Sequence, residues 1–220
     1  MNKNLEEMAQ AIYKNWFVDF EPFKDEEFVD SELGMIPVNM ELKSLKEFFP
    51  VKTGKKNANI ADDNGQYAFF TCSQEMKRAN EYSFDDTAIL LAGNGDFNVK
   101  WYRGKFEAYQ RTYVLIPDER KLFSFLYYSI DHFLDKLILG RRGSVISYLT
   151  KGMIEDLKIP VLKDQGLFND IIERLNIINC FIENNKDENQ SLKELRDSLL
   201  PKLMSGEIRV PLDEDAKEVN

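Results

Sequence analysis

The sequence predicts an α+β protein in which one mixed α/β globular domain is flanked by long helices that form an antiparallel coiled coil. Three patterns support this prediction: helical spacing of apolar residues near the N-terminus, short aromatic and β-branched runs in the middle, and a heptad-spaced apolar seam toward the C-terminus. The chain has 220 residues, of which 12% are aromatic, so it has enough apolar material for a packed core.

The first element expected is a helix over residues 1–20. Its apolar residues follow the three-to-four-residue spacing of one helical face and are Leu5, Met8, Ile12 and Trp16. Residues 21–40 are expected to form an extended linker, because Pro22 and a run of acidic residues disfavour regular structure there. The stretch 31–37 then marks the entrance to the next domain.

The middle of the chain, residues 41–164, is expected to form the mixed globule. Three aromatic and β-branched runs are strand candidates: Tyr67–Cys72, Ala88–Ala92 and Arg111–Ile116. Gly93–Asp96 signals a tight turn between two of them. Residues 119–139 carry a broad apolar face and are expected to form a helix.

A second long helix is expected over residues 165–207, followed by a tail at 208–220. Its seam steps by alternating fours and threes through Ile171, Leu175, Ile178, Ile182, Asn185, Asn189, Leu192, Arg196, Leu199 and Leu203. The two asparagines either fix the register of a coiled coil or mark a break between two shorter helices near 184–189. Pro201 and Gly206 are expected to end the helix, and residues 213–220 are expected to be disordered.

The two ends of the chain carry similar helical pieces. Residues Leu5, Met8, Ile12 and Trp16 match Leu192, Leu195, Leu199 and Leu203 at a constant offset of 187 positions. Chance similarity between amphipathic helices is one explanation, because this spacing is common. A duplicated architecture is the other, and each helix then needs a partner from a second copy of the chain or from another protein.

Charge is distributed unevenly. The net charge is -9, yet residues 51–163 hold 17 basic and 14 acidic residues, while the flanks hold 12 basic and 24 acidic ones. This asymmetry predicts different partners for different parts. The chain lacks an apolar run of about 18 residues, and its N-terminus does not look like a secretion signal. Cys72 and Cys180 are interpreted as buried free thiols, so a cytoplasmic protein without membrane contact is expected.

Motifs for catalysis are scarce. The lone histidine, His132, lies on an apolar helix and is better explained by packing. Zinc spacing, a phosphate-binding loop, a nucleophile elbow and the Asn/Asp-Pro-Pro-aromatic motif of adenine methyltransferases are all absent from the sequence. One alternative is a metal-dependent DNA endonuclease that uses Asp118, Asp156 and Lys158. No catalytic or metal-binding residue is assigned otherwise.

Cationic and polar loops within the basic part of the chain point to double-stranded DNA. Arginine can contact guanine with two hydrogen bonds, glutamine and asparagine can do the same with adenine, and lysines suit phosphates. The candidate DNA-binding residues are Lys55, Lys56, Asn94, Lys100, Arg103, Lys105, Gln110, Arg111, Arg141 and Arg142. Each stretch alone is also consistent with a solvated turn.

Four stretches carry a resemblance to the specificity subunit of type I restriction-modification systems. Residues 5–23 resemble the central conserved segment of that family, and residues 192–208 resemble its closing conserved helix. Residues 31–37 resemble the entrance of its target-recognition domain, and residues 143–161 resemble the exit. The interior of the domain is variable in this family and adds little.

The resemblance implies a half-length subunit with one target-recognition domain where the family has two. It implies no cofactor for this chain and no catalysis, because adenine methylation with S-adenosylmethionine belongs to a methyltransferase partner; a restriction or translocase subunit is a further possible partner. A homodimer would restore two domains, with its contacts made by the apolar residues of the two predicted helices, from Leu5 to Trp16 and from Ile171 to Leu203. The alternative is an inactive truncated product.

Overall fold

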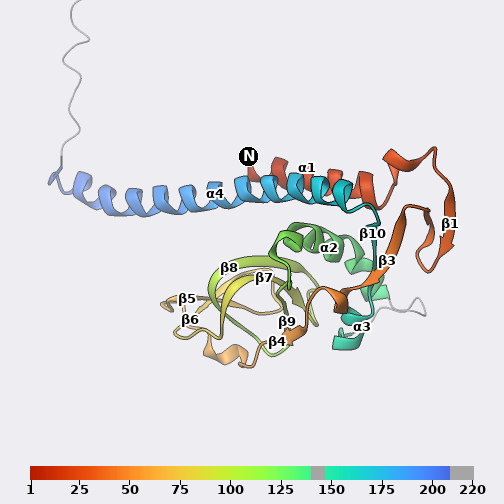
Figure 1. Cartoon of the computed structure of the whole chain (residues 1–220). Helices are drawn as coiled ribbons and strands as arrows, with labels where there is room; N and C mark the ends of the chain where they lie inside the picture. The colour runs from red at the N-terminus through yellow and green to blue at the C-terminus, as the bar shows by residue number, and fades with distance from the viewer. Residues whose placement is uncertain (140–146, 209–220) are drawn as a thin grey trace, which may run out of the picture.

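The computed structural model describes residues 1–139 and 147–208. A pair of helices lies along one side of the molecule, and a globule of strands and shorter helices hangs below one end of the longer helix (Figure 1). The fold is therefore α+β, as the sequence predicts. Within the described residues, no helix is long and apolar enough to cross a membrane.

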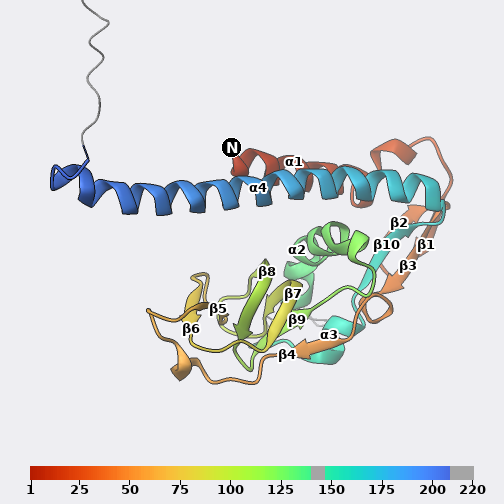
Figure 2. The same cartoon turned by 60° about the vertical axis from the view of Figure 1, so that its left-hand side comes forward.

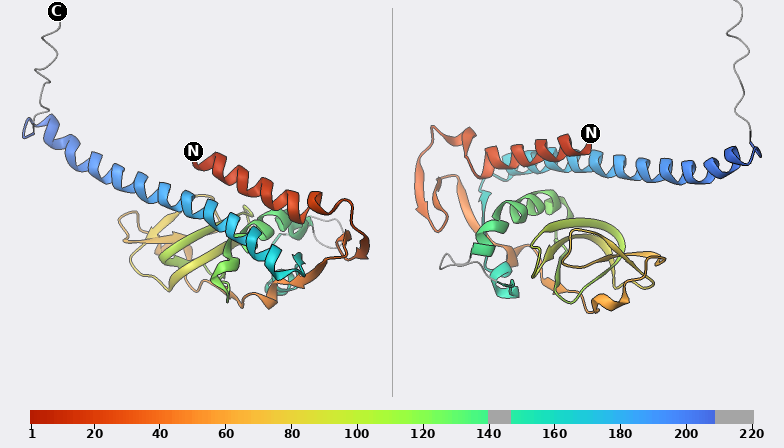
Figure 3. Two further views of the ribbon diagram at one scale, coloured as in Figure 1. Left: turned by 45° about the horizontal axis from the view of Figure 1, so that its top comes forward. Right: turned by 180° about the vertical axis from the view of Figure 1, so that it is seen from behind.

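The helix pair consists of α1 (Asn2–Phe17) and α4 (Gln165–Met204), which run antiparallel (Figure 3). At one end Asn2 donates a hydrogen bond of 3.4 Å to the carbonyl of Ile182, and at the other Phe17 packs edge-on against Phe168 at 6.2 Å. The buried residues of α1 are Ala9, Tyr13 and Phe17, so α1 packs within its own chain through a different set of residues from the predicted face, where Met8 is 54% exposed. A contact of that face with a second chain stays a prediction. Helix α1 packs against the first half of α4 in its own chain. We call residues 165–186 the proximal half of α4 and residues 187–204 its distal half.

Helix α4 is continuous over 40 residues, so the break considered near residues 184–189 is not present. Asp164 caps its first turn, since the carboxylate accepts hydrogen bonds from Gly166 and Leu167. Pro201 does not end the helix but lies within its last turns. The helix ends before Gly206, whose φ of 75° is the left-handed conformation that glycine adopts readily.

The segment expected to be an extended linker is folded. It contains a short 3-10 helix, η1 (Glu21–Phe23), and a hairpin of β1 (Phe28–Ser31) with β2 (Gly34–Pro37). The chain enters the globule through β3 (Met40–Ser44) and leaves it through β10 (Lys158–Leu162). These two strands pair antiparallel, so entry and exit are held together next to the predicted boundaries at 41 and 164.

A six-stranded sheet forms most of the globule, and it curls on itself (Figure 2). In spatial order its strands are β4 (Val51–Thr53), β9 (Thr112–Leu115), β7 (Phe84–Ala92), β8 (Val99–Ala108), β5 (Tyr67–Phe70) and β6 (Lys77–Ala79). The three strand predictions are confirmed by β5, β7 and β9. The expectation of a cationic loop around Lys100, Arg103 and Lys105 is wrong, because these residues lie in strand β8.

The helices of the globule are η2 (Leu45–Glu47), η3 (Ala58–Ile60), η4 (Arg120–Leu122), α2 (Phe123–Leu139) and α3 (Lys151–Glu155). Helix α2 confirms the prediction for residues 119–139. It lies between the helix pair and the sheet, and one large apolar core joins all three layers. A smaller core, which includes Phe70, Leu90 and Phe106, fills the curl of the sheet.

Candidate nucleic-acid interface

Loops that are far apart in sequence converge at one edge of the curled sheet. The carbonyl of Lys56 accepts a hydrogen bond of 2.9 Å from the amide of Gln110, and the amide of Gly54 donates one of 3.1 Å to the carbonyl of Thr112. Gly54 is required there, because a Cβ atom would lie 2.0 Å from the carbonyl oxygen of Ala108. The loop after β4 is thus fixed beside the loop between β8 and β9.

Two more loops join the same place through Arg111. Its carbonyl accepts hydrogen bonds from the amide of Gly93, at 2.8 Å, and from the thiol of Cys72, at 3.4 Å. Lys100 donates a hydrogen bond to the carbonyl of Ser73. We call residues 54–57, 71–73, 93–98 and 109–111 the loop junction. It contains five of the candidate DNA-binding residues: Lys55, Lys56, Asn94, Gln110 and Arg111. A sixth, Lys100 of strand β8, contacts it through Ser73.

The six residues differ in how available their side chains are. Lys55, Gln110 and Arg111 are exposed. Lys56 forms an ion pair of 2.5 Å with Glu81, and this hydrogen bond raises the pKa of Lys56. Burial lowers the pKa of Lys100, which is consistent with a role in holding the loops together. The first three are therefore the best placed to contact a ligand.

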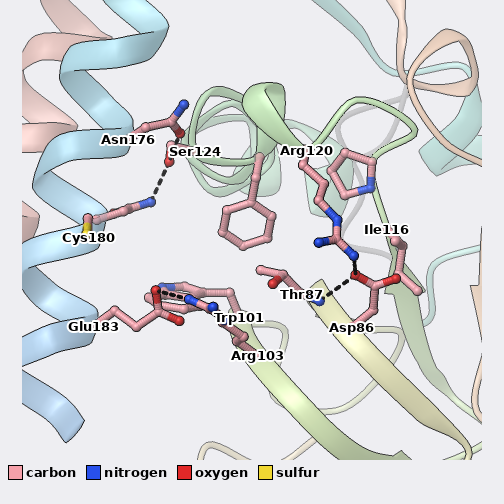
Figure 4. A pocket seen from close by; sticks show the side chains of 13 residues that line it. Asp86, Thr87, Trp101, Arg103, Ile116, Arg120, Ser124, Asn176, Cys180 and Glu183 are labelled. Carbon is pink, nitrogen blue, oxygen red and sulfur yellow. Dashed lines mark hydrogen bonds and ion pairs between the residues drawn. The ribbon is translucent and has the colours of Figure 1, made fainter.

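Arg103 and Lys105 lie outside the loop junction, because they belong to strand β8. Side chains alternate along a strand, so residues 102 and 106 enter the small core while 101 and 103 lie on the opposite face of the strand, toward α2 and α4. Arg103 pairs with Glu183 of α4 at 3.0 Å (Figure 4). Lys105 lies over the ring of Tyr82, 4.9 Å from its centre. Arg103 therefore lies on a strand and not on a loop, which corrects its expected place.

The Arg103–Glu183 pair closes one side of a cavity of about 170 Å³ between β8, α2 and α4 (Figure 4). On the same side, Lys186 lies 4.4 Å above the ring of Trp101. Deeper in, Asn179 accepts a hydrogen bond of 2.8 Å from Tyr128. These contacts hold the globule against the proximal half of α4. The cysteine at the cavity, Cys180, is exposed and Cys72 is half-buried, so neither is a buried thiol.

The residues of the endonuclease alternative make separate structural contacts. Asp156 forms an ion pair with Lys46 at 3.7 Å, and Lys158 forms one with Glu32 at 2.5 Å. Across residues 1–139 and 147–208, no group of three or more histidine, cysteine, aspartate or glutamate side chains could hold a metal ion. Arg141 and Arg142 lie outside the described residues.

Sequence reasoning missed two lysines near the loop junction. Lys52 is exposed on β4, and Lys151 begins α3. Together with Lys55 they line one open groove. Neither lies within an aromatic or glycine-rich motif, so the sequence contains no local signal for them.

Comparison with known proteins identifies what the chain is similar to. The family described as the type I restriction modification DNA specificity domain matches residues 37–194. The chain is 40% identical, over 181 residues, to the specificity subunit of the type I restriction enzyme EcoDI from Escherichia coli. It is 30% identical, over 235 residues, to the MjaIX specificity subunit from Methanocaldococcus jannaschii.

These matches cover 80% and 95% of the chain but only 40% and 54% of the two relatives, so the chain spans about half of their length. The fold is similar to a crystal structure of a type I restriction-modification S subunit from M. genitalium, with a TM-score of 0.62, 17% identity and coverage of 92% of this chain and 54% of that one. It is also similar to the HsdS subunit from Thermoanaerobacter tengcongensis, with a TM-score of 0.50, 16% identity and coverage of 94% and 52%.

Proposed function

Because the chain belongs to the family of type I restriction modification DNA specificity domains, we propose that it recognises one half of a DNA target and directs adenine methylation by a partner. One observation carries this proposal: the loop junction presents Lys55, Gln110 and Arg111 from backbone held by hydrogen bonds. Their types suit base and phosphate contacts.

The rest of the chain serves assembly. A methyltransferase subunit supplies S-adenosylmethionine chemistry, and a restriction or translocase subunit joins the complex where cleavage occurs. The chain itself positions these partners on DNA and performs no reaction. Two contacts support this role in assembly: the ion pair of Arg103 with Glu183 and the stacking of Lys186 on Trp101. Both join the globule to α4 and so fix the angle between them.

A second copy of the chain restores the two-domain arrangement. The distal half of α4 extends beyond α1 (Figure 3) and exposes Leu192, Leu199 and Leu203 by 55%, 37% and 39%. An apolar stripe of this kind is stabilised when a second helix covers it. Two copies related by a two-fold axis then read a palindromic site interrupted by a spacer, because the symmetry of the protein matches that of the DNA.

The test is a methylation map. The chain is co-expressed with a type I methyltransferase subunit from the same host, N6-methyladenine is mapped across the DNA, and a strain without the chain serves as the control. We expect modification at one interrupted palindrome only when the chain is present. Replacing Gln110 and Arg111 by alanine relaxes or abolishes that site preference.

The opposite result has a clear meaning. If both proteins are soluble and no methylation depends on the chain, the recognition role is wrong and the inactive truncated product is correct. A site that is methylated but not palindromic contradicts the homodimer alone.

A further inference from the structure

We propose that the groove lined by Lys52, Lys55 and Lys151 binds the phosphate backbone of duplex DNA beside the bases read at the loop junction. We call it the lysine groove. It lies between β4, the first turn of α3 and the start of β7, with an open volume of about 710 Å³. Its other lining residues are Val51, Thr53, Ser83 and Phe84. This inference rests on the proposed function, since it locates the phosphate contacts of the same DNA.

The fold holds the three lysines at the groove. Strand β4 pairs with β9 and lies at the edge of the six-stranded sheet, with Lys52 opposite Val114. Val51 is buried while Lys52 is exposed, so the lysine is directed to the surface by a fixed backbone. Lysines on edge strands also discourage pairing with other chains, which explains Lys52 alone but not its grouping with Lys55 and Lys151.

The groove is strongly cationic. Its lining contains three ammonium groups and no aspartate or glutamate. Within the described part of the chain, Lys52 and Lys55 form no ion pair, and Lys151 pairs with Glu155 at 3.3 Å while its side chain stays 57% exposed. The hydroxyl of Ser83 is used by Glu107, at 2.6 Å, which leaves the lysines as the main ligand-binding groups.

The shape and place of the groove favour a continuous polyanion over a small anion. It is open and presents cations from separate elements, whereas a site for a single free anion converges buried donors on one point. Lys55 belongs to both the groove and the loop junction, so a strand lying in the groove continues toward Gln110. Strand β4 and α3 lie on the side of the globule away from the helix pair (Figure 2), so the groove is open to a ligand that does not contact the helices.

Salt dependence of binding provides the test. The full chain, alone and in complex with a methyltransferase subunit, is titrated with a fluorescent 30-base-pair duplex of random sequence at several potassium chloride concentrations. Removing one lysine that neutralises a phosphate reduces the slope of log K against log salt by about 0.9. We therefore expect Lys52→Ala with Lys151→Ala to reduce the slope by about 2, equally for all sequences.

A matched control removes two lysines elsewhere. Lys3→Ala with Lys24→Ala makes the same charge change on α1 and beside η1, and we expect it to leave the slope unchanged. A variant slope equal to that of wild type overturns the groove while DNA recognition stands. If wild-type chain binds no DNA in either form, the proposed function fails and the groove fails with it. A thermal melt of each variant checks that it is folded.

Glu155→Gln gives the inference a second test in the opposite direction. It releases Lys151 from its intramolecular ion pair and removes a negative charge beside the groove. We expect tighter binding of the same random duplex and no gain when Lys151→Ala is already present. Equal gain in both backgrounds shows that Lys151 makes no contact with DNA and contradicts its place in the groove.

Discussion

The two halves of α4 share one apolar repeat but have different surroundings. In the proximal half, Ile171, Leu175 and Ile182 are 1%, 0% and 2% exposed, because α1 and α2 of the same chain cover them. In the distal half, Leu192 is 55% exposed and Leu195 is 53% exposed. The comparison shows that a heptad repeat identifies an apolar stripe but does not identify the partner that covers it.

The largest predicted effect belongs to the proximal half. Leu175→Asp places a carboxylate in a dry core without a cation to pair it, and we expect the free energy of unfolding to fall by about 3–5 kcal/mol. Urea unfolding monitored by circular dichroism measures this. Leu199→Asp, on the same repeat in the distal half, is the matched control.

For the control, we expect a change of about 0.5 kcal/mol or less at protein concentrations low enough for the chain to be monomeric, since an exposed site loses little packing. Equal destabilisation by the two substitutions would mean that the distal half is also covered within one chain. The comparison between the halves would then be wrong. Because Leu175 and Ile182 belong to the intramolecular core, their substitution reports folding and cannot serve as a test of dimerisation.

Dimerisation is tested in the distal half. Leu192→Asp with Leu199→Asp puts two charges into the proposed contact between copies, and we expect a shift from dimer to monomer with an unchanged helical content. Light scattering coupled to size exclusion, over a range of protein concentrations, measures the mass. Lys193→Asp, on a neighbouring turn, controls for added negative charge. A dimer of wild-type mass in the double variant contradicts the proposal.

The sequence predicted those parts of the fold that local chemistry decides. Strands β5, β7 and β9 are rich in aromatic and β-branched residues, and α2 has a broad apolar face, so their patterns are unambiguous. Strand β8 was missed because its cations alternate with aromatics, and that pattern also fits a binding loop. The hairpin β1–β2 was missed because its acidic residues are typical of a linker.

The candidate site was predicted less completely, for a physical reason. The loop junction depends on pairs such as Gly54 with Thr112 and Gly93 with Arg111, which join residues that only the curled sheet brings together. Arg103 was assigned to DNA from its residue type, but its pairing with Glu183 depends on where α4 crosses the globule. The residue types were enough to suggest DNA as the ligand. Which of these side chains pair within the protein instead depends on the three-dimensional arrangement of the strands and helices.

A smaller effect is expected where the register between α1 and the proximal half of α4 is set. The side-chain amide of Asn185 donates a hydrogen bond of 2.8 Å to Asn2, and the amide of Asn2 reaches the carbonyl of Ile182. Asn185→Ala removes the first contact, and we expect a loss of about 1 kcal/mol in urea unfolding. Asn189→Ala, one turn further along and exposed, should cost less. Equal losses would show that Asn185 does not set the register.

The smallest effect concerns Glu6, which joins α1 to α2 near the proximal half of α4. Burial raises the pKa of Glu6 above its ordinary value of 4.5, while the nearby Tyr127 hydroxyl and Lys186 lower it and Asp131 raises it. One carboxylate oxygen, Oε1, is buried without a hydrogen-bond partner among the described residues. The folded chain therefore disfavours the charged form.

The sign of the pH dependence follows from this raised pKa. Below the unfolded pKa both states are protonated and Glu6 carries no electrostatic cost, whereas the cost grows as pH rises from the unfolded pKa to the folded pKa and is complete above the latter. Glu6→Gln should thus raise the melting temperature at pH 7–8, and the gain in stability should stay below about 1 kcal/mol because the side chain is only half-buried and solvent screens its charge. The gain should vanish near pH 4. Glu7→Gln, on the exposed face of the same turn, should show no such pH-dependent gain, and a matching gain there would assign the effect to net charge instead of burial.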